Sequence, residues 1–280
     1  MIFNEITDKK IWNLTNALFN FREVLKESIQ NITVKDQSND LIAVIGGIGG
    51  KPHTYPKTEV LDFSGQNRMC DLTRSVRSYS HGGAVFKNQI VLCGGFSTFC
   101  YGGDDIDTLK NSRTKRRLST QRKHASTVSL NSSMIWIVGG LNKYTNYDGV
   151  RSTDFVFETD KKPVKGPELP ISAVYHCTVD LEDGSFMLIG GNQEDTVTSK
   201  TWIISPSQKA KEGPPLSTER YFHACGTMKD KYGNLMVVVA GGRNKDNLGM
   251  KSAEILNTTL MTKWHNGKLH NLLFLRIARY

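Results

Sequence analysis

The chain has 280 residues, with 36 Lys and Arg against 27 Asp and Glu, so its net charge of +9 favours acidic partners without specifying one. No apolar run approaches the ~18 residues of a membrane-spanning helix, and the N-terminus lacks the basic and apolar regions of a signal peptide. Five cysteines without C-x-x-C spacing argue against a zinc or redox motif, and their odd number predicts at least one free thiol.

A short apolar run that ends in two glycines occurs five times along the chain. The glycines are Gly46 and Gly47, Gly94 and Gly95, Gly139 and Gly140, Gly190 and Gly191, and Gly241 and Gly242. The steps between the first glycines are 48, 45, 51 and 51 residues, and a period near 50 indicates a repeat architecture. Each run predicts a strand buried on both faces. Because glycine lacks a Cβ atom, we expect another backbone to approach closely at each pair.

Further strands are expected on either side of each run. Those upstream begin at a histidine and cover residues 81–86, 124–128, 176–179 and 223–227. Those downstream cover residues 58–63, 105–109, 152–157, 200–204 and 252–256. A fourth, edge-like segment then ends in proline-containing linkers such as 166–170 and 213–216. Four antiparallel strands per repeat, repeated radially, predict an all-β propeller.

The order of these features resembles the kelch repeat over nearly the whole chain: apolar run, Gly-Gly, loop, Val-x-x-Asp-like strand, Trp, then Arg before His. The interior copies depart from that pattern, since only Trp264 and Trp12 match its late tryptophan. The resemblance implies a kelch-type β-propeller with five Gly-Gly blades plus an N-terminal half blade, incompletely closed. We expect a half blade at 1–14, blades at 20–73, 77–120, 122–168, 173–214 and 220–264, and a truncated linker at 265–280.

The same resemblance implies where a partner would bind. Kelch-like domains bind peptides through the loops before the first strand of a blade and after the Gly-Gly pair. Carried onto this sequence, the binding residues are Arg77, Tyr79, Arg122, Tyr175, Arg220, Tyr221, His53, Tyr55, Phe99, Tyr101, Tyr144, Tyr147, Arg243 and Asn244. Arg and Tyr are enriched at interface hot spots. The alternative is that the repeated arginines hold loops by hydrogen bonds to the backbone.

Three other patterns carry alternatives. His81, His124, His176 and His223 occupy equivalent repeat positions, so they would be spread around a propeller and are expected to be structural rather than metal ligands. Some kelch-like propellers are copper-radical oxidases, but Cys100 beside Tyr101 is no evidence of such a site. A basic cluster of Arg113, Lys115, Arg116, Arg117, Arg122 and Lys123 lacks interleaved aromatic residues, so we expect a solvated loop rather than a nucleic-acid site.

The sequence therefore predicts a non-catalytic protein–protein interaction module without cofactor or metal. Its partner would be a protein or peptide, preferably acidic, and neither nucleic acid nor membrane is expected. The family includes ubiquitin-ligase substrate receptors and actin-associated proteins, although no cullin-adaptor domain precedes these repeats. The missing signal peptide favours the cytoplasm, while residues 167–177 resemble secreted kelch-type proteins and keep an extracellular alternative open. The sequons at Asn13, Asn31, Asn131 and Asn257 barely favour it, since about three are expected by chance.

Overall fold

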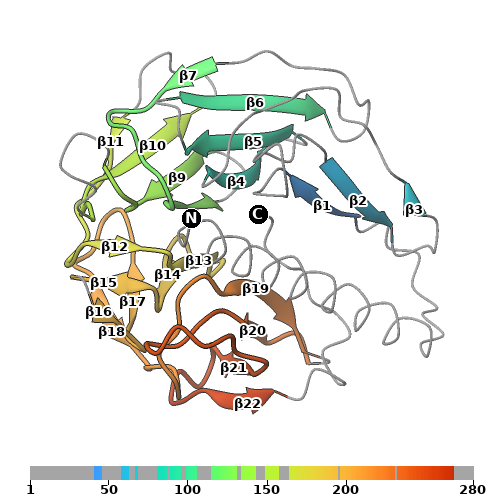
Figure 1. Ribbon diagram of the computed structural model, residues 1–280, viewed down its shortest axis with the longest axis vertical. Helices are drawn as coiled ribbons and strands as arrows, with labels where there is room; N and C mark the ends of the chain where they lie inside the picture. The colour runs from blue at the N-terminus through green and yellow to red at the C-terminus, as the bar shows by residue number, and fades with distance from the viewer. Residues whose placement is uncertain are drawn as a thin grey trace, which may run out of the picture. The chain divides into compact units, whose positions relative to one another are not determined.

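The computed structural model describes residues 41–45, 58–62, 67–68, 81–86, 89–95, 99–105, 115–130, 134–142, 149–157, 164–194, 196–230 and 232–267. The chain divides into two compact units, Met1–Tyr79 and Ser80–Tyr280. In the described ranges every regular element is a β-strand (Figure 1). The predicted all-β class is therefore confirmed.

The described residues of the first unit form a three-stranded antiparallel sheet of β1 (Leu41–Ile45), β2 (Thr58–Asp62) and β3 (Asn67–Arg68). The first apolar run forms β1, and the strand expected at 58–63 forms β2. These two strands pair along their whole length, from Leu41 opposite Asp62 to Ile45 opposite Thr58. The expected half blade at 1–14 and the glycines Gly46 and Gly47 lie outside the described residues.

The described residues of the second unit form four four-stranded antiparallel sheets, each built from strands in sequence order. The first has β4 (His81–Phe86), β5 (Gln89–Gly94), β6 (Phe99–Asp105) and β7 (Lys115–Arg117). The second has β8 (Ser126–Leu130), β9 (Met134–Val138), β10 (Thr153–Phe157) and β11 (Val164–Lys165). The third has β13 (Cys177–Asp180), β14 (Phe186–Ile189), β17 (Thr201–Ile204) and β18 (Lys211–Gly213). The fourth has β19 (Ala224–Lys229), β20 (Leu235–Ala240), β21 (Ala253–Asn257) and β22 (His265–Gly267).

A smaller sheet lies beside the third, with the order β12 (Ala173–Val174), β15 (Asn192–Gln193) and β16 (Thr196–Val197). Isolated bridges repeat this three-segment pairing elsewhere. Lys123 pairs with Leu141 and Leu141 with Gly149, while Tyr221 pairs with Arg243 and Arg243 with Gly249. The residues before the first strand of a sheet are thus tied to the loop that follows its glycine pair.

Most predicted strands agree with these sheets to within two residues, but the structure differs in two places. The strand expected at 105–109 is wrong, because the third strand of its sheet is β6, seven residues at 99–105. Gly102 and Gly103 resemble a turn, but a register shift opposite Gln89 and Val91 accommodates them within β6 as a bulge. At the other end of the unit, β22 continues the fourth sheet to Gly267, three residues beyond the expected end of its blade.

Hydrophobic clusters lie between successive sheets and explain the apolar runs. In β9, Ile135 and Ile137 pack with Ala84 and Val91 of the preceding sheet. Their neighbours Trp136 and Val138 pack instead with residues of the following sheet, including Phe186. The ring centroids of Trp136 and Phe186 are 4.5 Å apart. The strand is buried on both faces, as predicted, because alternate side chains of a strand point to opposite sides.

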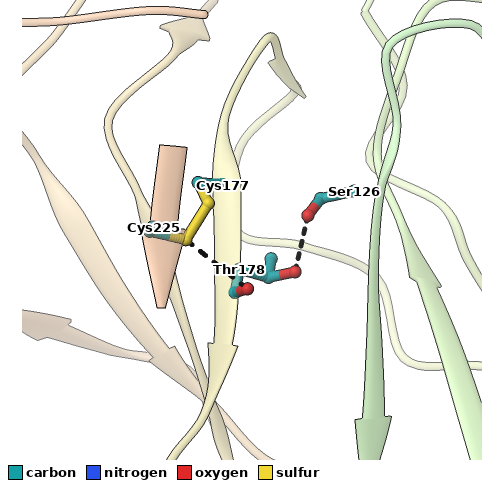
Figure 2. Close-up of a disulfide and its surroundings, with 4 residues drawn as sticks. All are labelled: Ser126, Cys177, Thr178 and Cys225. Carbon is teal, nitrogen blue, oxygen red and sulfur yellow. Dashed lines mark hydrogen bonds between the residues drawn. A yellow bond between two sulfur atoms is a disulfide. The ribbon is translucent and has the colours of Figure 1, made fainter. Parts of the chain in front are cut away.

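The first strands of neighbouring sheets contact each other in turn, β4 with β8, β8 with β13 and β13 with β19. Each junction uses the same two positions of the strands. Thr127 lies against Gly82, the hydroxyl of Ser126 hydrogen-bonds to that of Thr178 (2.6 Å), and Cys177 forms a disulfide with Cys225 (Figure 2). Successive sheets that touch through their first strands are consistent with a β-propeller-like class.

Candidate functional site

The glycine pairs form the joints between successive sheets. Every described pair, at 94–95, 139–140, 190–191 and 241–242, has positive φ at both residues. The amide of the second glycine donates to a carbonyl oxygen before the next sheet: Gly95 to Arg122 (2.7 Å), Gly140 to Ala173 (2.8 Å) and Gly191 to Arg220 (2.8 Å). A Cβ atom on the preceding glycine would lie within 3.0 Å of that same oxygen. The predicted close approach of another backbone is confirmed at these joints.

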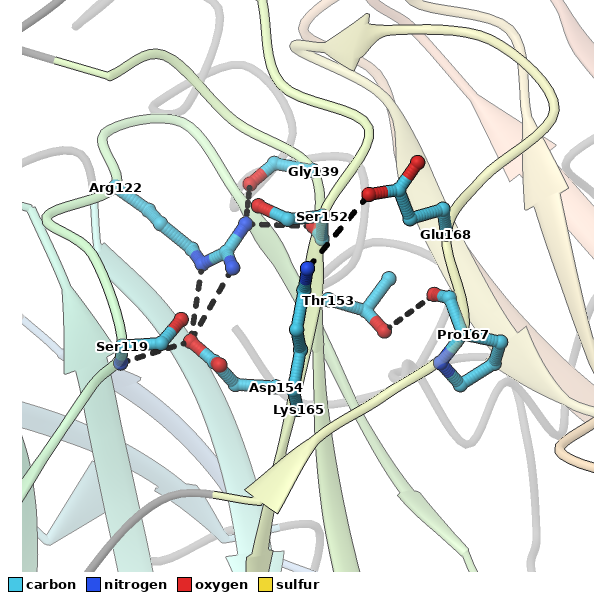
Figure 3. A network of polar contacts seen from close by, with 9 residues as sticks. All are labelled: Ser119, Arg122, Gly139, Ser152, Thr153, Asp154, Lys165, Pro167 and Glu168. Carbon is cyan, nitrogen blue, oxygen red and sulfur yellow. Dashed lines mark hydrogen bonds and ion pairs between the residues drawn. The ribbon is translucent and has the colours of Figure 1, made fainter.

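A buried ion pair between Arg122 and Asp154 lies beside the glycine pair of the second sheet (Figure 3). The guanidinium of Arg122 donates from Nε and Nη2 to Asp154 Oδ2 (3.3 and 3.2 Å), and both side chains are 0% exposed. Its Nη1 donates to the carbonyl oxygens of Gly139 (3.1 Å) and Ser152 (2.6 Å). The amide of Ser119 also donates to Asp154 Oδ2 (3.2 Å). One arginine therefore neutralises a buried carboxylate and satisfies two backbone carbonyls.

The fourth sheet repeats this arrangement. Arg220 Nη2 donates to Glu254 Oε1 (2.6 Å), and Nη1 donates to the carbonyl oxygens of Gly241 and Ser252 (3.2 Å each). The amide of Ser217 donates to Glu254 Oε2 (2.6 Å). The expectation that Arg122 and Arg220 bind a partner is therefore wrong, because fully buried side chains cannot contact one. They hold the backbone instead, which was the alternative interpretation.

In the third sheet, uncharged side chains bind the equivalent backbone carbonyl oxygens. Ala173 stands where the arginine would be, and Trp202 occupies the position of the carboxylate on the third strand. Gln193 Nε2 donates to the carbonyl oxygens of Gly190 (2.9 Å) and Lys200 (3.4 Å), which correspond to those that the arginines bind. Trp202 Nε1 donates to Gln193 Oε1 (3.2 Å). Arginine and carboxylate have thus been replaced together, as expected when either one alone would be buried unpaired.

His176 and His223 are buried at the joints. A Cβ atom on Gly139 would lie 3.1 Å from Cε1 of His176, and one on Gly190 would lie 3.0 Å from Cε1 of His223. Burial lowers the pKa of both histidines to about 3, and the charge of Arg220 adds to this at His223. Within the described part of the chain, no three His, Cys, Asp or Glu side chains are grouped so that they could hold a metal ion.

We expect the free energy of unfolding to decrease as the pH is lowered, because these histidines are neutral in the folded chain. The unfolded chain binds a proton at each imidazole near pH 6.5, whereas the folded chain does so only near pH 3. The destabilisation from these two histidines is thus smallest above pH 6.5, and each should cost about 1.4 kcal/mol between pH 7.5 and 5.5. Urea unfolding at the two pH values measures the loss. His176→Gln should have a weaker pH dependence than the wild type, and an unchanged one would contradict this account.

Four side-chain rings from three successive sheets are in contact beside the joints. They belong to His124, Tyr175, Tyr221 and Phe222, just before β8, β13 and β19. The ring centroid of Tyr175 lies 4.5 Å from that of His124, 4.3 Å from that of Phe222 and 6.2 Å from that of Tyr221. Phe222 is 49% exposed, whereas the other three are half-buried. We call these four residues the aromatic cluster.

Three residues of the aromatic cluster, one before each of the three sheets, have a left-handed backbone conformation. The φ angle is 54° at His124, 54° at Tyr175 and 53° at Phe222. The amide of Tyr175 donates to the carbonyl oxygen of His124 (3.4 Å), and the amide of Phe222 donates to that of Tyr175 (3.1 Å). Positive φ is uncommon for bulky residues and is concentrated at functional sites. Its repetition brings a ring from each of three sheets into one cluster.

Burial lowers the pKa of His124 to about 4, with a smaller contribution from the charge of Lys123. At neutral pH the imidazole is therefore uncharged. The aromatic cluster consequently presents four neutral rings, which suit an apolar side chain better than a charged one.

The loop at 243–249 lies next to the aromatic cluster. Arg243 Nη1 and the hydroxyl of Tyr221 both donate to Asn247 Oδ1 (2.7 Å each). Asn244 Oδ1 accepts a hydrogen bond from the amide of Leu248 (2.9 Å). These polar contacts fix the loop and leave the side chain of Leu248 63% exposed. The apolar surface at this end of the fourth sheet thus includes Leu248 as well as Phe222.

The structure brings together four of the predicted binding residues, which are Tyr175, Tyr221, Arg243 and Asn244. Phe99 and Tyr101 were expected in a loop, but they lie in β6. The basic cluster is not a solvated loop either, because Lys115–Arg117 forms β7 and both Arg122 and Lys123 are buried. Arg77, Tyr79, His53, Tyr55, Tyr144 and Tyr147 lie outside the described residues.

Phe222 was not predicted, and the repeat position predicted for His124 is wrong. His124 was expected to be equivalent to His176 and His223, whereas the left-handed backbone makes it equivalent to Tyr175 and Phe222. A signal for the correct register exists, because residues 118–122 and 216–220 share the pattern Leu-Ser-Thr-x-Arg. Alignment on that pattern places His124 opposite Phe222.

Comparison with known proteins gives a structural likeness alone. The structure of YjhT matches 68% of this chain with a TM-score of 0.57 and 14% sequence identity, and the match covers 65% of the YjhT chain. Less than two thirds of that chain is therefore represented, and at this identity the likeness concerns the fold. No family model matches the sequence, and no curated protein does. In the ranges that the structure describes, no helix has the length and apolar character needed to cross a membrane.

Proposed function

We propose that the chain is a non-catalytic, kelch-type propeller module that binds a segment of a partner protein at the aromatic cluster. The kelch assignment is supported by the Gly-Gly joints, by the first strands that contact in turn, and by the Arg–carboxylate pairs that recur in two sheets. Rigid joints suit a module that presents residues at the ends of its strands.

The observation that carries the binding proposal is the exposed ring of Phe222 within a strained backbone. A large apolar side chain that is 49% exposed contributes little to folding, yet it is held at a φ of 53° against Tyr175. Leu248, which is 63% exposed, lies in the loop at the same end of the fourth sheet. Interface hot spots combine such aromatic anchors with surrounding polar groups.

The surface suits a peptide that places an apolar side chain on the rings of the aromatic cluster. The net charge of +9 favours acidic residues beside that anchor, since opposite charges speed association. The buried Arg122 and Arg220 do not contribute to recognition directly. Affinity should therefore depend mainly on the rings, with a weaker dependence on salt concentration.

Phe222→Ala should weaken peptide binding at least about tenfold, because loss of an aromatic hot spot commonly costs 2 kcal/mol or more. Peptides would be selected on the wild-type protein from a random-sequence display library and measured by fluorescence anisotropy. Tyr232→Ala is the control, because this exposed tyrosine lies in the β19–β20 turn at the opposite end of the strands. The proposal fails if no peptide is selected, or if the selected peptides bind Phe222→Ala as tightly as the wild type.

A further inference from the structure

The Cys177–Cys225 disulfide indicates the kind of cellular compartment in which the chain folds. The two cysteines lie on the first strands of neighbouring sheets, with Cα atoms 6.0 Å apart, and they are 0% and 2% exposed. The two other described junctions use Gly82 with Thr127 and Ser126 with Thr178 at the same positions. The disulfide therefore uses a contact that the fold makes in any case. Such bonds form and persist in oxidising compartments.

A third disulfide-bonded cysteine also indicates an oxidising compartment. Cys93 of β5 is also disulfide-bonded and is 1% exposed. The chain thus fits a secretory compartment, where asparagine side chains in Asn-x-Ser/Thr sequences are glycosylated.

Asn257 is the sequon that falls within the described residues, and it ends β21. Its Oδ1 accepts hydrogen bonds from the amides of Thr259 (2.9 Å) and Leu260 (3.4 Å). The side chain of Asn257 is half-buried, whereas Thr259 and Leu260 are exposed. The carboxamide Nδ2 has no hydrogen-bond partner in the described structure. The Nδ2 atom of this half-buried side chain is therefore not engaged within the turn.

The two threonines of this turn are not equivalent. Thr258 Oγ1 donates to the carbonyl oxygen of Leu235 (2.8 Å), so its hydroxyl is used within the sheet. Thr259 occupies the third position of the sequon, and its exposed hydroxyl makes no hydrogen bond to a described residue. The hydroxyl that the sequon requires is thus the accessible one, and no proline interrupts the sequence.

We propose that Asn257 carries an asparagine-linked glycan. In this reaction a bond forms between Nδ2 of Asn257 and the anomeric carbon of a lipid-pyrophosphate-linked oligosaccharide. The bond from that carbon to the pyrophosphate oxygen breaks, and the lipid pyrophosphate leaves with the proton lost from Nδ2. Asn257 lies opposite Met236 at the start of β20, whereas Phe222 lies before β19 at the other end of the sheet. The glycan would therefore leave the aromatic cluster free, and this proposal does not depend on partner binding.

The test is site mapping on the native protein, purified from the cells that make it. Peptides are treated with an amidase that converts glycosylated Asn to Asp in ¹⁸O-labelled water and are then analysed by mass spectrometry. A labelled Asp at position 257 is the expected result. An unlabelled Asn257 overturns the proposal, whether or not alkylation without reduction finds Cys177 and Cys225 oxidised.

Two single substitutions distinguish use of this sequon from modification elsewhere. The full chain is secreted from eukaryotic cells as the wild type, as Thr259→Ala and as Thr258→Ala. Thr259→Ala removes the sequon and should abolish occupancy of Asn257, while Thr258→Ala keeps the sequon and should leave most molecules modified. Equal occupancy of Asn257 in the two variants would overturn the proposal. Mapping by peptide separates this site from the sequons at Asn13, Asn31 and Asn131.

Discussion

Gly139→Ala is expected to lower the free energy of unfolding by about 3–5 kcal/mol, which would unfold much of a marginally stable chain. Gly139 has a φ of 59°, a conformation that costs an L-residue about 1–2 kcal/mol. The added Cβ atom would also lie within 3.0 Å of the Ala173 carbonyl oxygen, which accepts the amide of Gly140. Relief of that contact requires two sheets to separate at their joint.

The control for this substitution is Gly184→Ala. Gly184 lies in the β13–β14 turn with a φ of 84°, and a Cβ atom there would meet no atom within 4 Å. It should therefore cost only the conformational term, about 1–2 kcal/mol. Chemical denaturation followed by tryptophan fluorescence measures both variants. If the two variants lose the same stability, the joint tolerates a Cβ atom, and the close-packing explanation of the glycine pairs is wrong.

The strands of this fold were predictable because burial on both faces leaves a continuous apolar run. β4 has the predicted bounds, and β9 and β20 end directly before their glycine pairs, as the apolar runs do. By contrast, the disulfide was not predicted, although Cys177 and Cys225 are 48 residues apart, close to the repeat period. Cysteines one repeat apart occupy neighbouring positions on adjacent sheets, so this spacing is a signal that a search for C-x-x-C motifs overlooks.

The residues of the candidate site were predicted in part, and the wrong assignments of Arg122 and Arg220 have a common cause. Arg122 and Arg220 were assigned to a binding surface because the sequence does not show which polar side chains have buried partners. Their carboxylates lie 32 and 34 residues away along the chain. The third sheet nevertheless contains a clue, because it lacks the arginine and the carboxylate together. When an arginine and a carboxylate are both absent from one internal repeat, the two residues can be expected to form an ion pair in the other repeats. Either residue taken alone would indicate a surface charge.

The Arg122–Asp154 pair gives a second large expected effect. Arg122→Met should lower the free energy of unfolding by about 3–5 kcal/mol, because it leaves the 0% exposed Asp154 carboxylate without its cation. Arg151→Met is the control, since the side chain of Arg151 is exposed and makes one hydrogen bond, to the Leu169 carbonyl oxygen. It should cost no more than about 1 kcal/mol.

The double variant Arg122→Met/Asp154→Leu should be more stable than Arg122→Met alone, by at least about 1 kcal/mol, because it removes the unpaired charge. It should stay less stable than the wild type, since the carbonyl oxygens of Gly139 and Ser152 lose their donor. The third sheet supplies that donor through Gln193, so the penalty is specific to a sheet without such a glutamine. A double-mutant cycle measured by urea unfolding decides the matter. Additive effects of the two substitutions would mean that charge pairing does not explain why this chain keeps or loses both residues together.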